Sequence, residues 1–334
     1  MPPSNSYRPE PSASSGTAVD LTDVQRAAAA VRDNVGRILI GQTRMVDLFL
    51  TALLADGHVL IEGVPGVAKT LTARLIARTL SVEFTRIQFT PDLMPRDVLG
   101  TAVFNPKTTT FTFKHGPVFS NVVLIDEINR APAKTQAALF EVMEERQVSA
   151  DGQTFALDAP FVVFATQNPL EHEGTYRLPE AQLDRFLFKI EVGYPSLDEE
   201  TQMLDRHHNG FGPGAIDTVE PVLTAEDLAR YRAAVRHVHV EPALFNYIAR
   251  LAHRTRNHDA LTLGGSPRAS VAILNAAKAF GALQGRDFVT PDDVQAVVPA
   301  ALRHRVILTP DMEMEGRTAD AVLDRILEQV DVPR

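Results

Sequence analysis

The spacing of apolar residues divides the chain into two parts. Between residues 20 and 55 apolar positions recur at helical spacing, and short apolar runs then alternate with helical stretches up to about residue 195. Beyond residue 224 only helical spacing recurs, and it predicts helices at 224–237, 241–256, 267–284, 291–301 and 317–330. We therefore expect an α/β domain over residues 21–195 and a small all-helical domain over residues 196–334.

Four short apolar runs in the first part predict buried strands of a parallel sheet. They cover residues 58–62, 84–89, 121–125 and 160–165, with helices expected at 69–80 and 133–145. Each run ends in polar residues, and ligands bind beyond the carboxyl ends of strands in such sheets. We expect the run at 160–165 to lie between those at 58–62 and 121–125.

Two segments predict β-hairpins inserted into this α/β pattern. Residues 104–116 alternate apolar and polar side chains around polar turn residues. Residues 148–157 contain Asp151-Gly152, a pair that suits a two-residue hairpin turn.

Composition narrows the classes of protein that fit this pattern. Of the 334 residues 45% are hydrophobic, which is enough for a substantial core, and none is cysteine, which excludes disulfides and thiolate metal sites. The net charge of -9 argues against nonspecific nucleic-acid binding. No apolar run is long enough for a membrane helix. Residues 1–20, rich in Ser, Pro and Ala, predict a disordered tail without a signal-peptide core, so we expect a cytoplasmic protein.

The sequence GVPGVAKT at 63–70 is the first candidate for chemistry. It follows an expected strand, precedes an expected helix and matches the phosphate-loop pattern G-x-x-x-x-G-K-[ST], except that Ala68 replaces the last glycine. Lys69 would contact the β- and γ-phosphates of a nucleotide, and Thr70 would bind Mg²⁺. Alanine is tolerated at position 68 if its φ is negative. A glycine turn that binds nothing remains the alternative.

Polar residues at the ends of two other strands strengthen this hypothesis. Asp126 and Glu127 follow the strand at 121–125, where Asp126 could hold Mg²⁺ and Glu127 could deprotonate an attacking water. Asn168 follows the strand at 160–165 and could hydrogen-bond both the γ-phosphate and that water. The alternatives are solvated acids at a strand end and a turn asparagine before proline.

These motifs together resemble the MoxR family of AAA+ ATPases, in the clade with an insert in helix 2. The segments that carry the resemblance span about residues 41–269 and are GVPGVAKT, TPDLMPRDVLG, FKHGPVFSNVVLIDEINRAPAKTQAALFEVMEE, ATQNP, LPEAQLDRFLFK and GGSPRAS. The family also accepts alanine before the lysine of the loop. The resemblance implies an AAA+ core with two hairpin insertions and a helical lid.

The resemblance also assigns site residues. It makes Glu127, Asn168, Arg185 and Arg268 catalytic, with Arg185 as an arginine finger for the neighbouring subunit and Arg268 as sensor 2. It places the nucleotide against Ile40, Gly41, Gln42, Gly63, Val64, Pro65, Gly66, Val67, Ala68, Lys69, Thr70, Leu71 and Asp126. Thr70 and Asp126 would be the metal-binding residues. The alternative for Arg185 is a salt bridge with Asp184 or Glu180 at the surface.

For function, the resemblance implies hydrolysis of ATP with Mg²⁺ in a ring, expected to be a hexamer. The work done would be chaperone-like remodelling or maturation of other proteins, with von Willebrand factor A domain proteins as expected partners. Three alternatives stay open: a motor on nucleic acid, a nucleotide-gated scaffold, and a subunit related to magnesium chelatase. DNA-stimulated hydrolysis would indicate the motor, whereas Glu127 argues against the scaffold because the proposed base is present.

Overall fold

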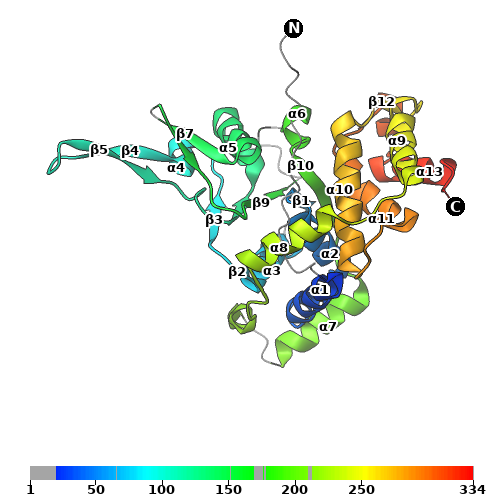
Figure 1. The fold of residues 1–334 in the computed structure, drawn as a ribbon, viewed down its shortest axis with the longest axis horizontal. Helices are drawn as coiled ribbons and strands as arrows, with labels where there is room; N and C mark the ends of the chain where they lie inside the picture. Colours follow the sequence, from blue (N-terminus) through cyan, green and yellow to red (C-terminus); the bar gives the residue numbers. More distant parts are fainter. Residues whose placement is uncertain are drawn as a thin grey trace, which may run out of the picture.

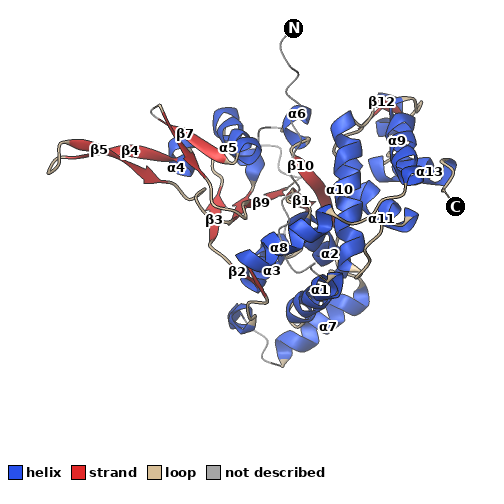
Figure 2. Cartoon of the chain, viewed as in Figure 1, coloured by secondary structure: helices blue, strands red, loops and turns tan. Residues whose placement is uncertain are grey.

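The computed structural model describes residues 20–64, 66–150, 152–168, 176, 178–209 and 213–333. Apart from Asp20, the tail expected at residues 1–20 lies outside the described residues. Figures 1 and 2 show a sheet with helices packed around it, a group of helices at one side and a long hairpin projecting at the other.

The central sheet has five parallel strands in the order β10-β1-β9-β6-β3. The strands are β1 (His58–Gly63), β3 (Phe84–Gln88), β6 (Val122–Asp126), β9 (Val162–Gln167) and β10 (Phe186–Val192). The expected position of β9 between β1 and β6 is confirmed. Edge strand β10 is an addition to the four strands that the sequence predicts.

Alternate residues of the strands face two apolar layers. On one face Val59 and Ile61 pack in a core shared with α1 (Leu21–Gly36), α2 (Thr43–Leu54) and α3 (Lys69–Thr79). On the other face Leu60 and Val123 pack with α5 (Ala133–Glu145) and α4 (Pro95–Leu99). Both faces are covered, as expected for a parallel sheet, so ligands have access only at its edges.

Both predicted hairpins are present. The first consists of β4 (Gly100–Asn105) and β5 (Thr110–His115), and the second of β7 (Gln147–Ala150) and β8 (Gln153–Ala156). Asp151 lies outside the described residues, and Gly152 has a φ of 75°, which a glycine adopts without strain. The first hairpin extends away from the rest of the chain (Figure 1).

The lid is helical, as predicted. The predicted helices are α8 (Ala225–Arg236), α9 (Pro242–Arg256), α10 (Pro267–Leu283), α11 (Pro291–Leu302) and α13 (Ala319–Gln329). The expectation of helices alone is wrong in detail, because β12 (Leu261–Leu263) pairs with β13 (Ile307–Leu308). Runs of two or three residues are too short to show a period.

Further short elements connect these parts. They are β2 (Leu80–Ser81), η1 (Ile128–Arg130), α6 (Glu180–Leu183), α7 (Leu197–His208), η2 (Pro213–Thr218), β11 (Leu223–Thr224) and α12 (Pro310–Met314). Strand β11 pairs with β2, so the chain returns to the α/β domain just before α8 begins.

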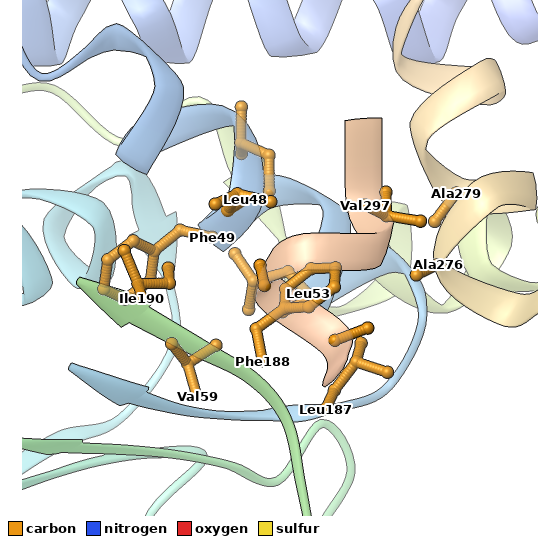
Figure 3. Close-up of a cluster of buried hydrophobic side chains, with 14 of the residues drawn as sticks. Leu48, Phe49, Leu53, Val59, Leu187, Phe188, Ile190, Ala276, Ala279 and Val297 are labelled. Atoms are coloured by element: carbon orange, nitrogen blue, oxygen red, sulfur yellow. The ribbon is translucent and has the colours of Figure 1, made fainter. Parts of the chain in front are cut away.

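The lid and the α/β domain share one apolar core. Leu53 of α2 and Phe188 of β10 belong to the same buried cluster as Ala276 of α10 and Val297 of α11 (Figure 3). Helix α11 lies against β10, and α10 lies against α2. The lid is therefore packed directly on the edge strand of the sheet.

Candidate functional site

The loop between β1 and α3 has the backbone shape that a phosphate site requires. Gly66 has a φ of 86°, and α3 begins at Lys69, so the positive end of its dipole faces the loop. The Lys69 ammonium donates hydrogen bonds to the carbonyls of Gly63 and Val64, the latter at 3.2 Å. Pro65 lies outside the described residues. The lysine is held along the loop, within reach of a phosphate placed there.

The expectation that Ala68 has a negative φ is wrong. Ala68 is the residue before α3 and has φ 60° and ψ 21°, which is the left-handed region. A non-glycine residue there costs roughly 1–2 kcal/mol. Position 68 therefore has the left-handed conformation that glycine adopts easily in the consensus loop, although the residue here is alanine.

Asp126 lies at the centre of the polar residues at the carboxyl edge of the sheet. Its side chain is only 5% exposed and accepts a hydrogen bond from the Thr70 hydroxyl, with an O–O distance of 2.8 Å. The Thr166 hydroxyl donates to the same carboxylate oxygen at 3.2 Å, and Nε of Arg86 donates to the other at 2.6 Å. Strands β3, β6 and β9 and helix α3 thus converge on one carboxylate.

Glu127, the expected base, has both its backbone and its carboxylate held in place. Its φ of 57° turns the chain sharply at the end of β6, and its N–H donates to the Thr166 hydroxyl at 3.0 Å. Gln88 and Arg130 both donate to Oε2 of Glu127, at 3.0 and 2.9 Å. In this arrangement the carboxylate is oriented by two side chains of its own subunit.

These groups surround one cavity of about 440 Å³. Its lining consists of Gly66, Val67, Ala68, Lys69, Thr70, Leu71, Arg86, Gln88, Asp126, Glu127, Thr166, Gln167 and Asn168. The phosphate loop, the two acids and Asn168 are therefore brought together as the sequence predicts. Thr70 and Asp126 offer adjacent oxygen ligands, the kind that Mg²⁺ prefers, so the donor set fits that ion.

The sequence hypothesis missed four polar residues of this site. Arg86 and Gln88 project from β3 into the cavity while Ile87 between them is buried, a period-two pattern that could have identified both. Thr166 joins the two acids; the sequence places it among the polar residues after the run at 160–165, but the hypothesis gave it no role. Arg130 follows Glu127 by three residues, and only the 3-10 turn η1 brings it back to the carboxylate.

Arg185 lies at the amino edge of the sheet, where the strands begin, whereas the cavity lies at the carboxyl edge, where they end. Phe186 pairs with His58 at the start of β1, whereas the phosphate loop leaves β1 at Gly63, beside Val192. Five residue steps of a strand span roughly 17 Å, so Arg185 cannot reach a phosphate bound by its own chain. Its guanidinium donates instead to Glu144 of α5 at 3.0 Å and to the Phe140 carbonyl at 2.9 Å.

Arg268 lies beside Arg185 rather than beside the cavity. It follows Pro267 in the first turn of α10, its side chain is exposed as expected, and Nη2 is 3.6 Å from Oε1 of Glu144. Glu144 therefore holds both arginines at the amino edge of the sheet. The partner of Arg185 is this glutamate, whereas Asp184 pairs with Arg305.

The segment expected near the base of the nucleotide, Ile40–Gln42, lies before α2. Gly41 has a φ of 79°, and a Cβ at this position would collide with the Glu199 side chain of α7. None of these three residues is among the described residues that line the cavity. Helix α7 and this segment are thus in close contact, next to the start of α2.

Comparisons with known proteins agree with this geometry. Residues 58–188 match the family described as ATPase family associated with various cellular activities (AAA), and residues 253–326 match an AAA lid domain. Within the described residues no helix is long and apolar enough to cross a bilayer.

Full-length relatives narrow the family further. The chain is 46% identical to the uncharacterized protein YeaC of Bacillus subtilis over 90% of its length and 93% of that protein. It is 44% identical to chaperone MoxR1 of Mycobacterium tuberculosis over 99% of its length and 88% of that protein. The crystal structure of a proposed ATPase from Cytophaga hutchinsonii aligns with TM-score 0.85 and 38% identity, covering 94% of this chain and 97% of that one. The chain is therefore an ATPase of the MoxR family of AAA+ proteins.

Proposed function

We propose that this ATPase works in a ring of identical subunits, a hexamer, in which neighbouring chains share each ATP site. The observation that carries the proposal is the separation of the two halves of the site. Lys69, Asp126 and Glu127 lie at the carboxyl edge of the sheet, whereas Arg185 and Arg268 lie at the amino edge beside Glu144. A complete site then requires two chains, each supplying one edge.

In this proposal the cavity binds the triphosphate. Lys69 and the N–H groups at the start of α3 contact the phosphates, and Thr70 with Asp126 would hold Mg²⁺. When bound there, the ion would neutralise charge on the phosphate oxygens. Glu127 accepts a proton from the attacking water, and Asn168 orients that water. The neighbour's Arg185 and Arg268 stabilise the negative charge that develops on the γ-phosphoryl group.

Glu127 also offers a point of control. Its Oε2 accepts hydrogen bonds from Gln88 and Arg130, so these two side chains compete with a water molecule for the same oxygen. Arg86 likewise lies against Asp126, where a metal ion bound with the nucleotide would bring its own positive charge. Binding of the nucleotide would rearrange these pairs and free Glu127 to act as the base.

We further propose that hydrolysis drives remodelling of other proteins through the β4–β5 hairpin. Phe104 and Phe111 form an aromatic pair near its tip with ring centroids 5.2 Å apart, and Phe111 is 73% exposed. Exposed aromatic side chains of this kind are typical of protein-binding surfaces. Chaperone MoxR1 is one of the full-length relatives, and a von Willebrand factor A domain protein is the partner we would test first.

Mixing two inactive variants tests the shared site. Lys69→Ala removes phosphate binding but leaves Arg185 in place, and Arg185→Ala does the reverse. Each variant alone should be unable to hydrolyse ATP efficiently, and Arg185→Ala should lower kcat by roughly 10³-fold or more. An equimolar mixture should recover activity, because some interfaces combine an intact loop with an intact arginine. Inactive mixtures that still form mixed rings would contradict the proposal.

Capture of clients tests the remodelling role. Glu127→Gln protein should bind ATP without hydrolysing it and so remain bound to its clients, the proteins that it remodels. These clients can then be identified after affinity purification from the source cells. A matched Glu127→Gln variant that also carries Phe111→Ser should capture less of the same clients. Equal capture by both variants would exclude the hairpin as the binding element.

A further inference from the structure

The turn after α11 covers the outer edge of strand β10. Strand β10 ends the sheet, so its outer carbonyl groups have no neighbouring strand to bond. Three successive basic residues of the lid, Arg303, His304 and Arg305, donate to them. Arg303 donates to the Lys189 carbonyl at 3.2 Å, and Nε2 of His304 donates to the Phe186 carbonyl at 3.0 Å. The lid is therefore hydrogen-bonded to the sheet as well as packed on it.

Arg305 forms more of these hydrogen bonds than Arg303 or His304, and most of them go to the residues around Arg185. Its Nε donates to the Asp184 carboxylate at 2.6 Å. Its Nη2 donates to the carbonyls of Asp184 and Phe186 at 2.9 and 2.8 Å, and Nη1 donates to Leu187 at 3.1 Å and to Ala301. All five N–H groups of the guanidinium are used. Four of these bonds go to residues on both sides of Arg185 in sequence, and the fifth goes to α11.

The burial of Arg305 makes this arrangement costly to disturb. Its side chain is 5% exposed, and burial lowers its pKa, while the hydrogen bond to Asp184 and the charge of Asp184 oppose the shift. His304 beside it is also buried, and burial together with the charge of Arg305 lowers its pKa well below the ordinary range. The imidazole stays neutral, and because the Phe186 carbonyl can only accept, its single N–H is on Nε2.

From this geometry we propose that Arg305 is a positioning residue for Arg185. It fixes residues 184–187, which are the turn before β10 and the first two residues of that strand, to the lid, so that the lid and the arginine offered to the next subunit move as one body. This inference rests on the proposed shared site and adds to it the route from the lid to the catalytic arginine. A lid displaced by nucleotide in one subunit would then move Arg185 relative to the neighbour's ATP.

Arg305→Lys tests the inference, with Arg303→Lys as the matched control. Lysine keeps the charge but cannot bond five acceptors. Arg303 lies in the same turn and pairs with Asp320 inside the lid at 2.7 Å, without touching residues 184–187. We expect Arg305→Lys to lower kcat about 10- to 100-fold, since a misplacement of about 1 Å can cost about 100-fold. ATP affinity should stay within about two-fold of wild type, because the phosphate loop lies roughly 17 Å away. Arg303→Lys should keep the wild-type kcat.

Two further readouts separate positioning from general damage. In an Arg185→Ala background, Arg305→Lys should cause no additional loss of kcat, because the residue that it positions is already missing. Arg305→Lys should also regain activity when mixed with Lys69→Ala, in the same way as Arg185→Ala. If Arg305→Lys does not fold, Asp184→Asn replaces it, since it removes one ionic bond and leaves the backbone contacts in place. We expect it to lower kcat about three- to ten-fold.

The inference is overturned if Arg305→Lys matches Arg303→Lys in kcat, if it loses ATP binding, or if its loss adds to that of Arg185→Ala. The inference is also overturned if Asp184→Asn has the same kcat as wild type. A failure of the shared site itself is recognised separately, because Arg185→Ala would then keep full activity whatever Arg305 does.

Discussion

His58 makes the stability of the fold depend on pH in a way that can be worked out from its contacts. It is 4% exposed at the start of β1, where Nε2 donates to the Met143 carbonyl at 3.2 Å and Nδ1 accepts from the Val163 N–H at 3.0 Å. A second proton on the ring would oppose the Val163 N–H. Burial, followed by the nearby charge of Arg146, lowers the pKa of His58 from 6.5 to about 3.

The direction of the effect follows from this depressed pKa. Below pH 6.5 the unfolded chain protonates His58, whereas the folded chain does not until about pH 3. Stability contributed by the neutral ring is therefore present above pH 6.5 and is lost as the pH falls from there toward 3. Between pH 7.5 and 5.5 the loss from this residue alone is about 1.4 kcal/mol. Buried His304 contributes in the same direction.

Urea denaturation at pH 7.5, 6.5 and 5.5 measures this loss, with His58→Gln as the matched variant. Glutamine can donate and accept hydrogen bonds but does not titrate, and all other groups are shared by the two proteins. The unfolding free energy of the variant should fall by about 1.4 kcal/mol less than that of wild type over this range. Parallel pH dependences for the two proteins would refute the argument and indicate that His58 titrates normally in the folded state.

Three further predictions concern the phosphate loop and the acids. Glu127→Gln should keep ATP binding but lower kcat at least about 100-fold, measured by phosphate release, and full turnover would remove Glu127 from the mechanism. Ala68→Gly should raise the unfolding free energy by up to about 1 kcal/mol in urea denaturation, because glycine adopts a φ of 60° without strain; a loss of stability would contradict this. Removal of Mg²⁺ with a chelator should stop hydrolysis, and Thr70→Ala should need more Mg²⁺ than wild type to recover. An unchanged Mg²⁺ requirement in a steady-state titration would exclude Thr70 as a ligand.

Local features of the sequence were sufficient to predict the carboxyl edge of the sheet. The phosphate loop, Asp126, Glu127 and Asn168 each follow an apolar run, and parallel strands must bring such positions to one edge. The conformation of Ala68 could not be obtained in this way, because the left-handed region is imposed by the loop as a whole and not by the residue. The contacts of Arg86 and Gln88 depend on the neighbour that β3 takes in the sheet, and the sequence does not state that neighbour.

The amino edge of the sheet was harder to predict. The resemblance identified Arg185 and Arg268, but their common partner Glu144 lies on a helix far from both in sequence. Strand β10 and its contact with the lid depend on pairing across more than a hundred residues. A buried Arg305 is also contrary to the usual expectation for arginine, and the Asp184 carboxylate together with the carbonyl groups at the start of β10 explains it.

The placement of the loop and the arginines at opposite edges has a consequence for assembly. In the proposed shared site, the surface that supplies Arg185 differs from the surface that supplies the phosphate loop. Contacts between copies would therefore be head-to-tail and would generate either a closed ring or an open filament. An open assembly of n chains has n − 1 complete sites, because one terminal loop has no arginine partner, whereas ring closure completes the last site. Activity per chain should therefore rise with concentration and reach its plateau when the rings close.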